Sequence, residues 1–135
     1  MRIAGFVLAM LSLLVAAGCD AAEDAAKDVA NDAACSVAQQ AMDEASRRAK
    51  QAVADLEADP QAAERELRAL RDSLATVEKQ VDGETEGQVT RARQALDRLV
   101  EQADAARGGT PVDDEAVADA RSDLDAAVED FSSVC

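Results

Sequence analysis

Apolar positions in the middle of the chain recur at the spacing of a helix. Leucine and valine return every three or four positions, at Leu67, Leu70, Leu74, Val77 and Val81. Steps of three and four place these side chains on one face of an α-helix, whereas a half-buried strand would alternate every second residue. We therefore predict an amphipathic helix here, with its apolar face turned toward a core.

The same period marks three further segments, in which many apolar positions are alanine. The first segment runs from about Cys35 to Ala58, the third covers residues 89–106 and the fourth covers residues 117–134. Their apolar faces consist of Val37, Ala38, Ala41, Ala45, Ala49, Ala52, Val53 and Leu56, then Val89, Ala92, Leu96, Leu99, Ala103 and Ala106, then Val117, Ala120, Leu124, Ala127, Val128, Phe131 and Val134. The pattern thus predicts four helices.

Turn and capping residues stand between these segments. Asp59-Pro60 fits a helix cap followed by the proline that is favoured in a first turn. Gly83 suits the left-handed end of the second helix. Thr85 and Gln88 have the spacing of a capping box that would open the third helix.

Glycine and proline also separate the third segment from the fourth. Gly108-Gly109 predicts the end of the third helix. Thr110-Pro111-x-Asp113 then predicts the start of the fourth, with Pro111 in its first turn. All the connections are short, which favours antiparallel neighbours.

The expected fold is an all-α, up-down-up-down four-helix bundle. The alternative is a three-helix bundle with a long first helix kinked at Pro60. Leucine, isoleucine, valine and phenylalanine make up only 19 of the 117 residues from position 19 onward. Such a share, with a high net charge, is typical of disordered chains. Because alanine is the best helix former and the helical period persists, we nevertheless expect a folded bundle with a thin core. Self-association through a coiled-coil-like leucine seam of the second helix would add burial.

Composition excludes several classes of function. The net charge is −14, aromatic residues make up 1% of the chain, and histidine, tyrosine and tryptophan are absent. Histidine-based catalysis and histidine-ligated metal sites are therefore impossible. The charge also has the wrong sign for nucleic acid, and no aromatic stacking platform can be built. We expect no enzyme, no cofactor and no metal site.

The N-terminus has the features of a targeting segment. Arg2 is followed by the uncharged run Ile3–Ala17, which is shorter than the ~20 residues of a membrane span. A basic start, a short apolar run and small residues after it are typical of a signal peptide. We predict that residues 1–18 are removed on export.

The sequence Val15-Ala16-Ala17-Gly18-Cys19 resembles the lipobox of bacterial lipoprotein precursors. The resemblance implies that Cys19 receives a diacylglyceryl group, carries fatty acids such as palmitate, and becomes the first mature residue. Two or three acyl chains hold a protein stably at a membrane. Asp20 is similar to the signal that retains lipoproteins at the inner membrane. We therefore expect the outer face of the cytoplasmic membrane, with the outer membrane as the alternative.

Residues 19–34 are rich in alanine and aspartate, and we expect a solvated acidic tether that is in part helical. Residues 35–135 would form the bundle domain. If Cys19 is lipidated, Cys35 and Cys135 remain, and exported proteins can form disulfides. An up-down-up-down bundle brings the start of the first helix and the end of the fourth to the same end, so we predict a Cys35–Cys135 bond.

The fourth segment carries an acidic row at Glu115, Asp119, Asp123 and Asp130. Repeated like charges at i,i+4 spacing destabilise a helix, so the row is a candidate contact face for a basic partner. The alternatives are divalent-cation binding and a merely solvated face. Arg93 or Arg98 of the third segment would neutralise part of it. The sequence thus predicts a non-enzymatic, membrane-anchored envelope lipoprotein that acts as a structural or protein-interaction module; the alternative is a divalent-cation-binding acidic helical protein.

Overall fold

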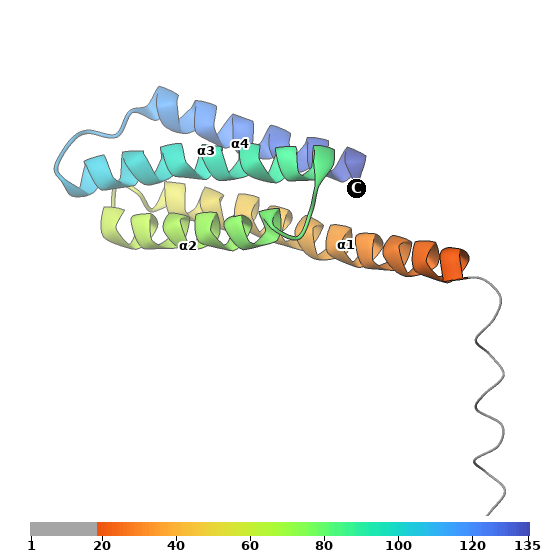
Figure 1. The fold of residues 1–135 in the computed structure, drawn as a ribbon. Coiled ribbons are helices and arrows are strands. Elements are labelled where there is room, and N and C mark those ends of the chain that lie inside the picture. The colour runs from red at the N-terminus through yellow and green to blue at the C-terminus, as the bar shows by residue number, and fades with distance from the viewer. Residues whose placement is uncertain (1–18) are drawn as a thin grey trace, which may run out of the picture. The chain divides into compact units, whose positions relative to one another are not determined.

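The described chain consists of α1 (Cys19–Ala54), α2 (Pro60–Glu78), α3 (Gly83–Arg107) and α4 (Asp114–Val134) (Figure 1). The structure is a computed structural model, and it describes the backbone of residues 19–135 and the side chains from residue 26 onward. The predicted signal peptide and the lipidation of the Cys19 side chain lie outside this range. Among the described helices, none has a stretch apolar and long enough to span a membrane.

Two units divide the chain, Met1–Asn31 and Asp32–Cys135. In the first unit the residues from Cys19 to Asn31 are helical, and the side chains of residues 26–31 are exposed. The first helix therefore begins at Cys19 rather than near Cys35. The reason is local, because this segment is rich in alanine, the best helix former, and contains neither glycine nor proline.

The unit Asp32–Cys135 is a four-helix bundle, as predicted. Helices that follow one another along the chain run antiparallel and pack side by side (Figure 1). The kinked three-helix alternative is wrong, because α1 ends at Ala54 and a turn precedes the start of α2 at Pro60.

The predicted apolar faces form the core. Its largest fully buried side chains are Phe131, Met42, Leu56, Leu67, Leu74, Leu96, Leu99, Leu124 and Val89. Alanines such as Ala38, Ala49 and Ala92 fill much of the remainder. The leucines of α2 are used inside this core, so they are not available as the self-association seam that the sequence suggested.

Some predicted core positions were wrong. Val37 is 54% exposed and Val134 is 39% exposed. Met42 is fully buried, although the alanine-rich pattern did not single it out. Val37 stands beside Ala38 at the edge of the face, and Val134 lies in the last turn of α4 beyond Phe131, where the core ends.

The cap at the start of α2 was predicted correctly. The Asp59 carboxylate accepts a hydrogen bond from the Ala62 backbone N–H at 2.9 Å, and Pro60 is the first helical residue. This bond satisfies one of the orphan donors of a helix N-terminus.

The predicted starts of α3 and α4 were misplaced. The helix α3 begins at Gly83, so Thr85 lies within its first turn and donates to the Asp82 carbonyl instead of forming a capping box. Pro111 lies before α4, whose N-cap is Asp113. Gly109 has φ of +87° and follows the end of α3, as expected of a glycine at a helix stop.

Candidate functional site

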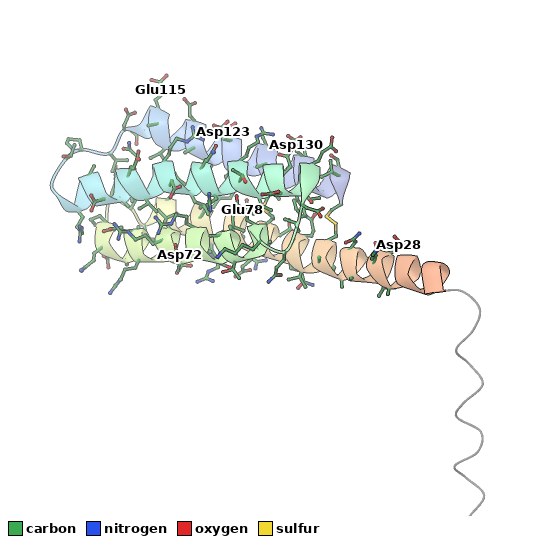
Figure 2. The ribbon with its side chains drawn as sticks, viewed as in Figure 1. Asp28, Asp72, Glu78, Glu115, Asp123 and Asp130 are labelled. Carbon is green, nitrogen blue, oxygen red and sulfur yellow. A yellow bond between two sulfur atoms is a disulfide. The ribbon has the colours of Figure 1, made fainter. Side chains whose placement is uncertain are left out.

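The acidic row of α4 is divided by ion pairs to α3. Figure 2 shows Glu115, Asp123 and Asp130 along α4. Asp123 Oδ2 lies 2.6 Å from Arg98 of α3, and Asp130 Oδ2 lies 3.0 Å from Arg91. Both aspartates therefore face the neighbouring helix and are partly neutralised by it.

Glu115 and Asp119 differ from those two aspartates. Both are exposed, and within the described side chains neither takes part in an ion pair. Of the two arginines expected to neutralise the row, Arg98 does so, whereas Arg93 binds Glu78 of α2 at 2.6 Å. Of the four acids in the predicted contact face, only Glu115 and Asp119, near the start of α4, therefore lack an ion pair among the described side chains.

The described residues contain no group of three or more acids or cysteines placed to hold a metal ion. The spacing along α4 explains why the row does not converge on one point. Side chains at i, i+4 and i+8 follow one another along a helix face rather than meeting around a common centre. A cation cage needs several oxygens at about 2.3–2.6 Å from one ion.

Ion pairs join all four neighbouring pairs of helices in the bundle. Arg48 of α1 lies 2.5 Å from Glu66 of α2, and Lys50 of α1 lies 3.0 Å from Asp125 of α4. The seams between α2 and α3 and between α3 and α4 each contain further pairs. Most of these side chains are substantially exposed, and each exposed pair adds at most about 1 kcal/mol.

Asp125 is the centre of a polar cluster between α1 and α4 that sequence reasoning missed. Its Oδ1 accepts a hydrogen bond from the Ser46 hydroxyl at 2.8 Å and lies 3.0 Å from Lys50 Nζ. Ser46 is only 8% exposed. Burial works to raise the pKa of the Asp125 carboxyl, but the bonds from Ser46 and Lys50, with the charge of Arg121, lower that pKa overall.

Glu64 is the most buried charged residue in the described part of the chain, at 5% exposure. One carboxylate oxygen lies 2.6 Å from Arg68, and the other lies 3.0 Å from Arg107 of α3. A buried carboxylate held by two guanidinium groups fixes the register of two helices and leaves no charge unpaired. The sequence signal was that Glu64 stands three positions before Leu67, on the apolar face.

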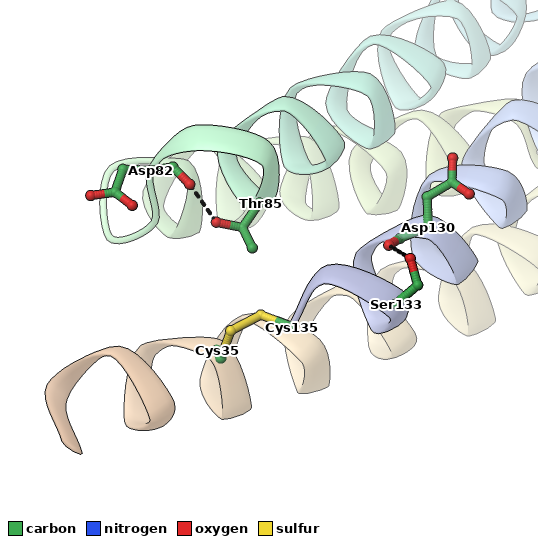
Figure 3. Close-up of a disulfide and its surroundings, with 6 residues drawn as sticks. All are labelled: Cys35, Asp82, Thr85, Asp130, Ser133 and Cys135. Carbon is green, nitrogen blue, oxygen red and sulfur yellow. Dashed lines mark hydrogen bonds between the residues drawn. A yellow bond between two sulfur atoms is a disulfide. The ribbon is translucent and has the colours of Figure 1, made fainter. Parts of the chain in front are cut away.

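Cys35 and Cys135 form the predicted disulfide, with their Cα atoms 5.6 Å apart (Figure 3). The bond joins α1 to the last residue of the chain across 100 positions. It lines an open hollow of about 330 Å³ together with Asp32, Ser36 and Gln39 of α1. Cys135 itself is exposed and Cys35 is half-buried.

Two other hollows lie on the bundle. One of about 340 Å³ is formed by the connections before α2 and α4, where Leu56, Pro60 and Pro111 line it. The other, of about 540 Å³, lies along α4 beside Arg121, Ser122 and Asp125. Among the residues that the structure describes, no hydrogen bond joins the Ser122 hydroxyl to a carboxylate.

No protein-family model matches this chain, and no curated protein or solved structure matches it either.

Proposed function

We propose that this chain is an exported bacterial lipoprotein, anchored through acyl chains on Cys19 at the outer face of the cytoplasmic membrane. Its helical bundle works by contact with other proteins and not by catalysis. The outer membrane is the alternative address. The support comes from the N-terminal sequence, the disulfide and the surface charges of the bundle.

The observation that carries the proposal is the disulfide between Cys35 and Cys135. Structural disulfides persist in oxidising compartments outside the cytoplasm. The bond uses two of the three cysteines, and the third, Cys19, directly follows the apolar run and the small residues that resemble a lipobox. Export and lipidation together thus account for every cysteine in the chain.

The proposed contact surface is the exposed, unpaired part of α4 near Glu115 and Asp119. A chain of net charge −14 attracts basic surfaces and repels anionic lipid headgroups. A basic partner protein is therefore the expected occupant, and it would approach the bundle on the side where α3 leaves the acids of α4 unpaired.

The anchor is tested by metabolic labelling with a fatty acid that carries an alkyne. The intact chain should take up the label and partition with membranes, and a Cys19→Ala variant should lose both properties. The matched control is the double variant Cys35→Ala/Cys135→Ala, which should keep the label. An unlabelled chain, or a mature N-terminus other than Cys19 in mass spectrometry, would contradict the anchor.

The contact surface is tested by a photo-crosslinking residue in the native envelope. Placed at Asp119, it should form a crosslink to one defined basic protein. Placed at Arg65, an exposed position on α2, it should not form that product. Equal crosslinking from both positions would argue against α4 as the contact face.

A further inference from the structure

We propose that the Cys35–Cys135 disulfide is a reversible clasp, opened by thiol–disulfide exchange with a dithiol reductant or a dithiol oxidoreductase. The bond is not enclosed by the bundle. Figure 3 shows the two cysteines joined between α1 and the end of α4. Cys135 is exposed, Cys35 is half-buried, and both line an open hollow of about 330 Å³. A thiolate can therefore approach a sulfur without prior unfolding of the core.

The exchange proceeds in two steps. A thiolate of the reductant attacks the sulfur of the more exposed residue, Cys135, and forms a mixed disulfide, while the Cys35 sulfur leaves as a thiolate and takes up a proton. The second thiol of the reductant then attacks its own sulfur in the mixed disulfide, which releases the Cys135 thiolate. The protein gains two electrons and two protons, and the reductant is oxidised to its own disulfide.

Opening the bond would release one end of the bundle and leave the rest in place. Cys135 directly follows α4, and beyond Phe131 the side chains of this segment are exposed. Away from the disulfide, the nearest polar contact between α1 and α4 is that of Ser46 and Lys50 with Asp125. Asp125 lies 10 residues before Cys135, and Ser46 lies 11 residues after Cys35. Between these points no hydrogen bond or ion pair joins the described parts of α1 and α4, and the buried side chains there include Ala38 and Met42 of α1 and Phe131 of α4.

The charge around the clasp restricts the class of reductant. The acidic residue Asp32 lines the same hollow. Negative charges repel an approaching thiolate, and this repulsion is screened by salt. An oxidoreductase with a neutral or basic rim around its thiol would be preferred over an acidic one.

Native-state reduction kinetics test the clasp directly. A Cys19→Ser variant of the full chain leaves only Cys35 and Cys135, so the result does not depend on lipidation. It is incubated with dithiothreitol, quenched with N-ethylmaleimide and weighed by mass spectrometry. The rate constant in water should lie within about tenfold of that in denaturing urea, because exchange depends on access to the sulfur. A rate constant in water more than about tenfold below that in urea would show that reduction requires unfolding, and would overturn the proposal.

Two variants test the local charge. Asp32→Asn should accelerate reduction, and Ser36→Asp, in the same hollow, should slow it. The matched control is Asp114→Asn at the start of α4, which should leave the rate unchanged. Equal rates for all three variants would contradict the placement of the attacking thiolate.

Hydrogen exchange of the reduced protein tests the opening. Amides in residues 36–45 and 126–134 should exchange faster after reduction, while those in residues 89–103 of α3 keep their protection. Unchanged exchange everywhere would show that the bond is not a clasp. Loss of protection throughout would show that it is a purely structural staple.

Discussion

At the scale of single residues, polar side chains at the contacts between helices favour one register of the bundle. Ser46 and Glu64 are buried, and both are satisfied by partners on neighbouring helices. Within the described residues, no buried side-chain nitrogen or oxygen lacks a hydrogen-bond partner. An unsatisfied group would cost about 1–3 kcal/mol, so these contacts favour one register of the helices over shifted ones.

The Asp125 cluster predicts a specific dependence of stability on pH. Because the pKa of Asp125 is lowered in the folded state, the unfolded chain binds more protons, and this contribution to stability is lost as pH falls below the ordinary value of 3.8. Urea unfolding should show Asp125→Asn to be less stable than the parent by about 1 kcal/mol near neutral pH. The difference should shrink in acid, as the pH falls below 3.8 and the carboxylate takes up its proton.

The control for this prediction is Asp119→Asn, an exposed acid on the same helix. Its difference from the parent should be small at both pH values. If the Asp125→Asn difference stayed constant with pH, the carboxylate of Asp125 would not be the titrating group.

Sequence reasoning missed these cross-helix contacts for a physical reason. A pair such as Glu64 and Arg68 is spaced i,i+4 and can be identified along the chain. The contact from Glu64 to Arg107 depends on the relative register of α2 and α3, which no local pattern contains. The disulfide was predictable because the number of helices and their up-down topology alone bring Cys35 and Cys135 to the same end of the bundle.

At the scale of helices, the N-cap residues of α2, α3 and α4 differ in the number of backbone N–H groups that they cap, and mutation can measure this difference. Asp59 accepts one backbone N–H bond and Asp113 accepts two, whereas Asp82 makes no side-chain capping bond. Asp59→Ala and Asp113→Ala should each lower the free energy of unfolding by about 1 kcal/mol. Asp82→Ala should change it much less. Equal losses at all three positions in urea titrations would contradict the assigned caps.

Two glycines predict changes of opposite sign. Gly109 has φ of +87°, a conformation that strains an L side chain, so Gly109→Ala should destabilise the protein by about 1 kcal/mol. Gly87 lies inside α3 with open space at its missing Cβ, so Gly87→Ala should stabilise it by about 0.5–1 kcal/mol. Thermal melting followed by circular dichroism measures both; a lower melting temperature for Gly87→Ala would contradict the placement of that residue.

Helix faces were easier to predict from sequence than helix ends. The three- and four-residue steps of Leu67, Leu70 and Leu74 fix a buried face regardless of the tertiary context. Thr85 and Gln88 have capping-box spacing, yet the same spacing occurs inside a helix, and here the left-handed Gly83 begins α3 before them. The geometry of the preceding loop decides at which of these residues the helix begins, and this geometry cannot be predicted from the amino-acid composition.

At the scale of the whole molecule, a thin core is held by many small contributions. Alanine lines much of the interior and gains less from burial than leucine, because hydrophobic stabilisation follows the apolar area removed from water. Exposed ion pairs between helices add little each. A bond across 100 positions is then a large contribution, since it restricts the unfolded chain more than any other single contact.

The double variant Cys35→Ala/Cys135→Ala measures that contribution. In the chain-entropy model, closing a loop of about 100 residues stabilises the folded state by up to about 4.7 kcal/mol, and real bonds commonly give 2–4. The midpoint of urea unfolding should fall accordingly, and the slope should rise, because the unlinked unfolded chain exposes more surface. The oxidised parent treated with reductant should approach the same midpoint, which separates loss of the bond from loss of the cysteine side chains. If the midpoint were unchanged, the alanine-rich core alone would hold the bundle together, and the disulfide would mark the export route of this chain without supporting its fold.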